Sequence, residues 1–103
     1  ELAWTSFETA TRKIKLKWFG ANSHREGERI HPCQKPVMLY RFILENYAEK
    51  GQRILDTHLG SGSSRIAAYE LGFDFVGFET DTKMCELSDK RFVNAISQLR
   101  LSF

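Results

Sequence analysis

Two carboxylates and a glycine-rich turn are the residues of this sequence best suited to bind a ligand. Residues 54–62, Ile-Leu-Asp-Thr-His-Leu-Gly-Ser-Gly, form a short apolar run that ends in Asp56 and turns through two glycines. Glycine permits positive φ and lets a ligand approach the backbone closely. A second carboxylate, Glu79, ends the alternating segment 73–79. A carboxylate at that point can accept hydrogen bonds from a ribose diol, which indicates a nucleoside-bearing cofactor.

These residues must be positioned by a strand, a loop, a helix and a second strand. The apolar run 53–55 predicts a buried strand, segment 73–79 predicts the next one, and Gly72 is placed to end the helix between them. Three serines can cap the start of that helix: Ser61, Ser63 and Ser64. An order of this kind implies a crossover and a parallel pair of strands. Because ligands bind outside the carboxyl ends of parallel strands, we expect Asp56 and Glu79 at one edge of the sheet.

The spacing favours S-adenosylmethionine over a dinucleotide as the cofactor. A dinucleotide fingerprint needs a third small residue for close packing of helix and strand, and counting from Gly60 and Gly62 that position is Arg65. No Gly-Lys-Ser/Thr occurs, which excludes a P-loop. The competing hypothesis is a tight strand-to-helix turn with a capping carboxylate and no ligand. The second carboxylate at the next strand end favours the ligand.

A second group of polar residues precedes an amphipathic helix. The segment 31–36, His-Pro-Cys-Gln-Lys-Pro, places His31 and Lys35 at a loop–helix junction within reach of the Asp56 loop. Pro36 suits a first helical position, and Gly51 suits the end of the helix. The apolar face of this helix carries Val37, Tyr40, Ile43, Leu44 and Tyr47. Spacing alone does not separate a ligand site here from an ordinary helix start with solvated His and Lys.

Taken together, these motifs resemble the C-terminal part of amino-group DNA methyltransferases, which methylate adenine N6 or cytosine N4. The resemblance runs from about His31 to Arg91 and includes Gly77-Phe-Glu-x-Asp81. The motif order resembles the permuted β-type arrangement, in which the catalytic motif precedes the cofactor motifs. Residues 2–7 also resemble a late strand of that domain. The resemblance implies S-adenosylmethionine as cofactor and double-stranded DNA as a partner of the complete enzyme.

The resemblance also assigns a set of cofactor-binding residues. They are His31, Gln34, Lys35, Asp56, His58, Gly60, Ser61, Gly62 and Glu79. The segment 31–35 matches the loop that helps hold the amino-acid end of the cofactor, and Glu79 matches the ribose-binding acid. Asp56 would face the positively charged end of the methionine moiety or orient the loop. Thr57 and His58 stand where the family usually has Pro and Phe, although a histidine can also lie against an adenine ring.

One expected motif is missing from the sequence. Family members hold the flipped base with an Asp/Asn/Ser-Pro-Pro-aromatic motif, whereas the two prolines here, Pro32 and Pro36, are not adjacent. We therefore assign no catalytic residue and expect no methyl transfer by this chain alone. Complete enzymes of the family are longer than 103 residues. A truncated gene product, an excised piece or one part of a split enzyme would fit, and exposed strand edges would favour self-association.

The predicted fold class is α/β: a partial Rossmann-like methyltransferase domain with a small, mainly parallel sheet and flanking helices. We expect one domain over residues 1–103, with edge strands and a loop in 1–30 and the cofactor-binding core in 31–103. The basic face of an N-terminal strand predicts DNA contacts through Arg12, Lys13, Lys15 and Lys17. A solvated edge strand protected by its lysines explains the same pattern. The net charge of +2 does not by itself indicate a nucleic-acid binder.

The last predicted helix, about 82–99, carries an apolar stripe typical of core packing. Asp81 or Thr82 can cap its start, and its solvated face is predicted to hold Lys83, Lys90 and Arg91. The cysteines match no standard metal-site spacing, so no metal is expected. No stretch approaches the length of a membrane span and no signal peptide is visible, which predicts a cytoplasmic protein.

Three functional hypotheses follow from the sequence. The first is the cofactor-binding portion of a working DNA methyltransferase, whose other portion supplies the Pro-Pro-aromatic motif. The second is a cofactor-binding module or remnant without catalysis. The third is a DNA-binding accessory domain that uses the basic N-terminal segment and leaves the cofactor loop empty.

Overall fold

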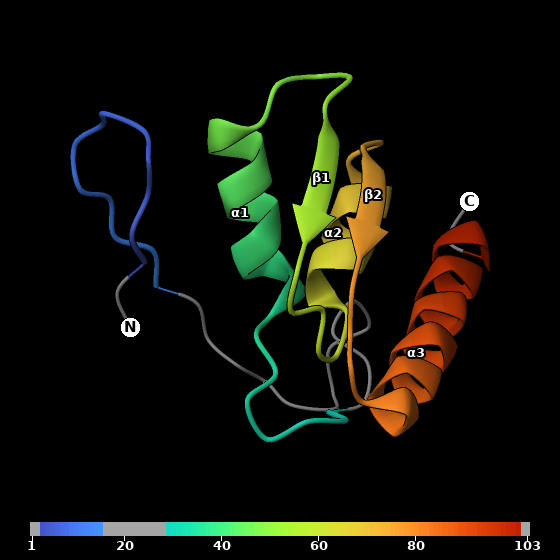
Figure 1. Cartoon of the computed structure of the whole chain (residues 1–103). Coiled ribbons are helices and arrows are strands. Elements are labelled where there is room, and N and C mark those ends of the chain that lie inside the picture. The colour runs from blue at the N-terminus through green and yellow to red at the C-terminus, as the bar shows by residue number, and fades with distance from the viewer. Residues whose placement is uncertain (1–2, 16–28, 102–103) are drawn as a thin grey trace.

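The structure, a computed structural model, describes residues 3–15 and 29–101. Its elements along the chain are α1 (Val37–Tyr47), β1 (Arg53–Asp56), α2 (Ser63–Glu70), β2 (Asp74–Gly77) and α3 (Thr82–Leu101). The two strands pair in parallel, with Ile54 beside Phe75 and Asp56 beside Gly77 (Figure 1). The α/β fold and the parallel pair are therefore as the sequence predicted.

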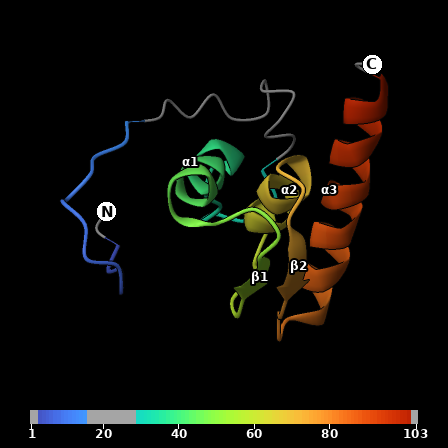
Figure 2. The same cartoon turned by 90° about the horizontal axis from the view of Figure 1, so that it is seen from above.

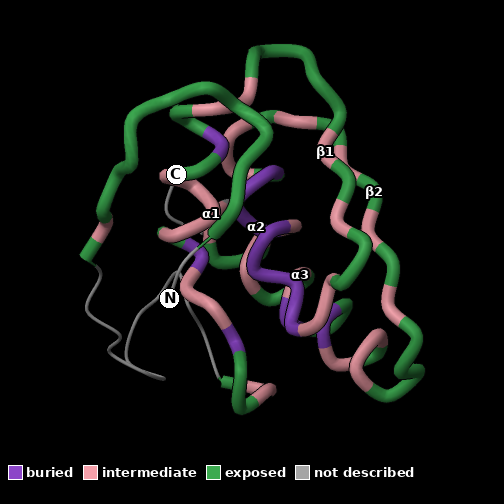
Figure 3. The backbone as a smooth tube through the Cα atoms, turned by 60° about the vertical axis from the view of Figure 1, so that its left-hand side comes forward, coloured by how far each residue is buried: buried purple, intermediate pink, exposed green. Residues whose placement is uncertain are grey.

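Helix α2 forms the centre of the core. It packs against α1, β2 and α3, and its residues Ile66, Ala67 and Ala68 are buried together with Val37 and Leu44 of α1. The buried part of the backbone is concentrated along α2 (Figure 3). Small alanine side chains allow neighbouring helices to approach α2 closely, so this short helix is the element against which the other helices pack.

The two faces of the sheet differ in how they are covered. Seen from above, α1 and α2 lie on the same side of β1 and β2 (Figure 2). Ile54 and Phe75 point to this side and pack against the core. Their neighbours alternate outward: Leu55 is 61% exposed, Val76 39% and Phe78 58%. We call Leu55, Val76 and Phe78 the open face of the sheet.

Glycines set two of the element ends. Gly62 precedes α2 in the left-handed conformation, at φ +82°. Gly72, at φ +79°, follows the same helix, where the Phe73 N–H donates to the Ala68 carbonyl at 2.9 Å. The predicted helix stop at Gly72 is confirmed. In contrast, α1 ends at Tyr47, before the predicted Gly51, because the chain turns to an extended conformation at the next residue.

The predicted N-terminal edge strands are not found in the described residues. Residues 3–15 form neither strand nor helix and lie against the end of α1 (Figure 1). There the Phe7 ring lies 5.4 Å from the Tyr47 ring, and Arg12 donates to the Asn46 side chain at 2.6 Å. A strand needs a neighbour to satisfy its backbone N–H and C=O groups. Because residues 3–15 pair with neither β1 nor β2, the alternating pattern of 12–15 does not become a strand.

Candidate functional site

The chain segments that leave β1 and β2 run side by side at the carboxyl edge of the sheet. Backbone hydrogen bonds continue beyond the strands, from the Phe78 N–H to the Asp56 carbonyl and from the Leu59 N–H to the Phe78 carbonyl, both at 2.9 Å. Asp56 ends β1, and Glu79 lies two residues beyond the end of β2. The two carboxylates therefore reach the same edge, as the strand order predicted.

Asp56 fixes the loop that follows it. Its Oδ1 accepts the His58 N–H at 3.0 Å, and its Oδ2 accepts the Ser64 hydroxyl at 2.5 Å. Both carboxylate oxygens are thus used within the loop and the start of α2. Of the two roles predicted for Asp56, orientation of the loop agrees with these contacts. The His58 side chain is exposed, and its Nδ1 lies 2.9 Å from the Thr57 hydroxyl oxygen.

Glu79 is held from two sides by backbone donors. Its Oε1 accepts the Gly60 N–H at 2.9 Å, and its Oε2 accepts the Asp81 N–H at 3.0 Å. These donations, from Asp81 first and then from Gly60, lower the pKa of Glu79 below its ordinary value because they stabilise the charged form. A carboxylate has about four lone-pair sites, so Glu79 can still accept bonds from a diol.

The segment before α1 is joined to the same loop through its backbone. The Ser63 hydroxyl donates to the Lys35 carbonyl at 2.6 Å. Upstream, a tight turn is closed by the Gln34 N–H, which donates to the His31 carbonyl at 3.1 Å, and by the Cys33 N–H, which donates to His31 Nδ1 at 3.0 Å. The two predicted ligand segments therefore meet at the start of α2.

Gln34 has a donor with no partner in the described part of the chain. Its side chain is 6% exposed, its Oε1 accepts the Ile30 N–H at 3.0 Å, and its Nε2 bonds to none of the described residues. Leaving a buried donor unsatisfied costs about 1–3 kcal/mol. An amide donor of this kind suits a carboxylate acceptor, such as the amino-acid end of S-adenosylmethionine.

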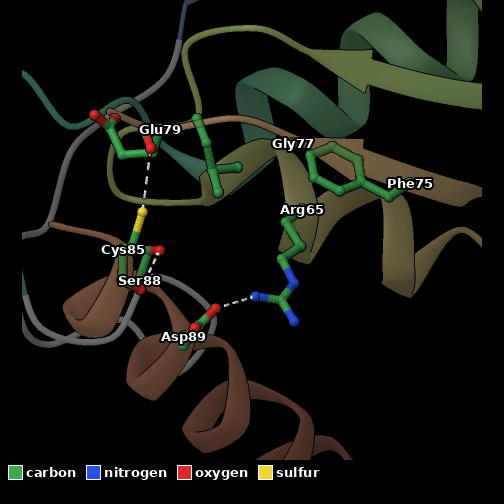
Figure 4. A pocket seen from close by; sticks show the side chains of 8 residues that line it. Arg65, Phe75, Gly77, Glu79, Cys85, Ser88 and Asp89 are labelled. Carbon is green, nitrogen blue, oxygen red and sulfur yellow. Dashed lines mark hydrogen bonds and ion pairs between the residues drawn. The ribbon is translucent and has the colours of Figure 1, made fainter. Parts of the chain in front are cut away.

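A cavity of about 280 Å³ adjoins Glu79 between β2 and α3 (Figure 4). Gly77 leaves room there, since a Cβ at this position would lie 2.9 Å from the Phe75 ring. At the other wall, Arg65 pairs with Asp89 at 2.7 Å and stacks over the Phe92 ring at 3.8 Å. Arg65, which argued against a dinucleotide fingerprint, thus packs against α3.

The predicted serine caps and one predicted surface cation are corrected by the structure. The N-cap of α2 is Gly62, with no side-chain cap bond, because the hydroxyls of Ser63 and Ser64 bond to more distant partners. Arg91 was expected on a solvated face but is 6% exposed. Its position, three residues after the buried Ser88, lies on the apolar stripe of α3, and that spacing could have revealed its burial.

The remaining predicted positions are placed as follows. Gly60 is partly buried and Ser61 is buried in the loop. Arg12, Lys13 and Lys15 are exposed, whereas Lys17 lies outside the described residues. Within residues 3–15 and 29–101, no cluster of three His, Cys, Asp or Glu side chains could hold a metal ion. No helix in these ranges is both long and apolar enough to cross a bilayer.

Comparison with known proteins identifies the family. The N6/N4 methyltransferase family model, described as DNA methylase, matches residues 5–90. The chain therefore belongs to this family of DNA methylases. Among curated proteins it is 32% identical over 88 residues to the Type II methyltransferase M2.DpnII of Streptococcus pneumoniae, covering 85% of this chain and 28% of that protein. It is 34% identical over 73 residues to M2.MboI of Moraxella bovis, covering 71% and 27%.

A solved structure shows the same fold. The crystal structure of the M1.HpyAVI–SAM complex superposes with a TM-score of 0.65 at 25% sequence identity, covering 86% of this chain and 41% of the other. The chain thus spans less than a third of the curated relatives named above and under half of the solved one. The prediction that this chain is part of an amino-group DNA methyltransferase domain is confirmed.

Proposed function

We propose that this chain is the S-adenosylmethionine-binding portion of a DNA methyltransferase that acts on adenine N6 or cytosine N4. Methyl transfer then takes place only together with a second portion that carries the Pro-Pro-aromatic motif. The main support for the cofactor site is that Gln34 Nε2 is a buried donor without a partner in the described residues. Gln34 lies on a segment that is joined to the Asp56 loop. The similarity to a methyltransferase solved with SAM supports the same choice of ligand.

The roles of the residues follow from their contacts. S-adenosylmethionine supplies the methyl group, and the chain supplies its binding surface. Glu79 accepts hydrogen bonds from the ribose diol with the lone pairs that its backbone donors leave open. Gln34 donates to the carboxylate of the amino-acid end, with His31 and Lys35 on the same segment. Asp56 holds the Gly60–Gly62 loop in shape.

The open face of the sheet supports a second portion of the enzyme. Parallel sheets are almost always covered on both faces, whereas Leu55 and Phe78 are more than half exposed. The relatives are more than three times longer than the part that this chain matches. The portion with the Pro-Pro-aromatic motif is therefore the partner that we expect on this face, with DNA as the substrate of the assembled enzyme.

The alternatives have less support. A non-catalytic cofactor-binding remnant would share the site and differ only in lacking a second portion. A DNA-binding accessory domain relied on a basic N-terminal strand, but residues 12–15 form no strand, and Arg12 contacts α1 through Asn46. The exposed Lys13 and Lys15 could still contact phosphates in an assembled enzyme.

Calorimetric titration with S-adenosylhomocysteine tests the cofactor site. We expect the wild-type chain to bind and Asp56→Ala to lose binding. Without the Asp56 carboxylate, the His58 N–H and the Ser64 hydroxyl lose the acceptor that fixes the loop. Asp74→Ala is the matched control, since Asp74 is an exposed aspartate at the opposite end of the neighbouring strand. Equal binding by both variants, with thermal unfolding showing that both are folded, would reject this site.

A transfer assay tests the second half of the proposal. The chain is incubated with DNA and methyl-labelled S-adenosylmethionine, alone and with a separately produced portion of a relative that contains the Pro-Pro-aromatic motif. We expect label in DNA only in the mixture. Transfer by the chain alone contradicts the need for a second portion, and a mixture that stays inactive although the chain binds the cofactor favours the remnant.

A further inference from the structure

Arg91 of α3 reaches across the core to the cofactor loop. It is 6% exposed, and its Nη1 donates to the Ser61 carbonyl at 3.0 Å and to the Ser63 hydroxyl oxygen at 2.8 Å. Burial of a charged guanidinium is costly unless its donors are satisfied. A leucine or methionine would fill the same space on the apolar stripe without that cost, so the contacts made by the guanidinium require an explanation.

The Ser63 hydroxyl extends this contact to a third segment. It accepts the bond from Arg91 and donates its own hydrogen to the Lys35 carbonyl at 2.6 Å. A chain of hydrogen bonds therefore runs from α3 through the first turn of α2 to the segment before α1. The last of these segments carries Gln34, which we propose to bind the amino-acid end of the cofactor.

The opposite side of the loop is held by Glu79. While the Ser61 carbonyl accepts from Arg91, the Gly60 N–H donates to Glu79 at 2.9 Å. Beneath the loop, a Cβ on Gly62 would lie 3.4 Å from Ser88 Cβ, so α3 and the loop are in close contact. The peptide groups of Gly60 and Ser61 are thus fixed by side chains on both sides.

We propose that Arg91 is a positioning residue of the cofactor site, which holds the Gly60–Gly62 loop and the Lys35 segment in the geometry that binds S-adenosylmethionine. This inference rests on the proposed function but names a residue outside the motifs that define the site. Arg91 does not contact the cofactor in this role. It acts through Ser61 and Ser63. The competing explanation is that Arg91 contributes only to the stability of the core.

Two substitutions and one control separate these explanations. Arg91→Met keeps the apolar stem and removes the guanidinium, whereas Arg91→Lys keeps the charge and a donor. Lys90→Met is the matched control because Lys90 is the exposed neighbour on the same helix. Each variant is measured by thermal unfolding, by titration with S-adenosylhomocysteine and by carbon-13 NMR titration of the Glu79 carboxyl group.

We expect Arg91→Met to weaken S-adenosylhomocysteine binding about tenfold, equivalent to about 1.4 kcal/mol. We also expect it to move the pKa of Glu79 toward its ordinary value, because a released loop no longer aims the Gly60 N–H at the carboxylate. Arg91→Lys should recover part of both effects, and Lys90→Met should change neither. Such a partial recovery is not expected of a residue that only fills space.

The outcomes are distinguishable. Arg91→Met that lowers the melting temperature but leaves both the affinity and the Glu79 titration unchanged overturns the proposal. Absence of binding by the folded wild-type chain counts against the proposed unaided cofactor site, while the Glu79 titration still decides the role of Arg91. If Arg91→Met does not fold, Arg91→Lys decides the question, because lysine lacks the planar guanidinium. Wild-type affinity for S-adenosylhomocysteine together with a wild-type pKa of Glu79 in this variant would overturn the proposal.

Discussion

The Ser64 hydroxyl donates to Asp56 Oδ2 at 2.5 Å and so joins the last residue of β1 to the first turn of α2. The other oxygen of the same carboxylate accepts the His58 N–H. One side chain therefore fixes the beginning and the end of the glycine-rich loop. From this arrangement we expect loop geometry, rather than a direct ligand contact, to be the main task of Asp56.

Ser64→Ala should weaken both the fold and cofactor binding. Ser64 is 6% exposed, and loss of a buried hydrogen bond to a charged group costs about 1.5–3 kcal/mol. Urea denaturation measures this loss, and titration with S-adenosylhomocysteine should show a several-fold lower affinity. Ser97→Ala is the control, because Ser97 is exposed on α3 and, among the residues that the structure describes, bonds only within its own helix, at the Val93 carbonyl. Equal effects of the two substitutions would contradict the role of Ser64.

The part of the fold that the sequence predicted is the part set by local patterns. The two strands, the helix end at Gly72 and the position of Glu79 follow from apolar alternation and from residues adjacent in sequence. Asp81 caps α3 as predicted, accepting the Met84 N–H at 3.2 Å. Each of these features needs only a few neighbouring residues to specify it, so each could be predicted without a tertiary structure.

The missed features depend on contacts between distant residues. The hydroxyls of Ser63 and Ser64 suit a helix cap locally, but Lys35 and Asp56 offer them partners that only the folded chain brings near. Arg91 is buried where its Nη1 meets the Ser61 carbonyl and the Ser63 hydroxyl, two acceptors that are distant in sequence. The expected N-terminal strands had the right alternation, but residues 3–15 pair with neither β1 nor β2.

The ion pair between Arg41 and Glu70 should stabilise the contact between α1 and α2. Its atoms lie 2.6 Å apart, with side chains 20% and 4% exposed, and the bond to Glu70 is the main reason that the pKa of Arg41 is raised. Glu70→Gln should lower the free energy of unfolding by about 2 kcal/mol. Asp89→Asn breaks a pair whose carboxylate is 69% exposed, so it should cost less than about 1 kcal/mol. Chemical denaturation of both variants checks the ranking, and equal losses would contradict it.

Adjacent residues of β1 should differ strongly in how much the same substitution destabilises the chain. Ile54 packs against the core, so Ile54→Ser should destabilise the chain by about 2–4 kcal/mol. Leu55 is 61% exposed on the open face, so Leu55→Ser should change stability by about 0.5 kcal/mol or less. Leu55→Ser should also lower the binding of a hydrophobic dye and any self-association seen by sedimentation. Strong destabilisation by Leu55→Ser would mean that the face is already covered in the isolated chain.

The pH dependence of stability should carry a contribution from Glu79. The pKa of this group is lowered from 4.5 in the folded chain, so the unfolded chain takes up the proton first as the pH falls. The contribution of Glu79 is therefore complete above pH 4.5 and is lost as the pH falls through the lower folded-state pKa. The nearby Asp81 carboxylate opposes this shift but does not reverse it.

Urea denaturation across this range checks the prediction for wild type, for Glu79→Gln and for Glu86→Gln, an exposed control on α3. Glu79→Gln should flatten this part of the acid limb, while Glu86→Gln should retain it. An unchanged limb in Glu79→Gln would mean that the Gly60 and Asp81 N–H groups do not hold the carboxylate in solution.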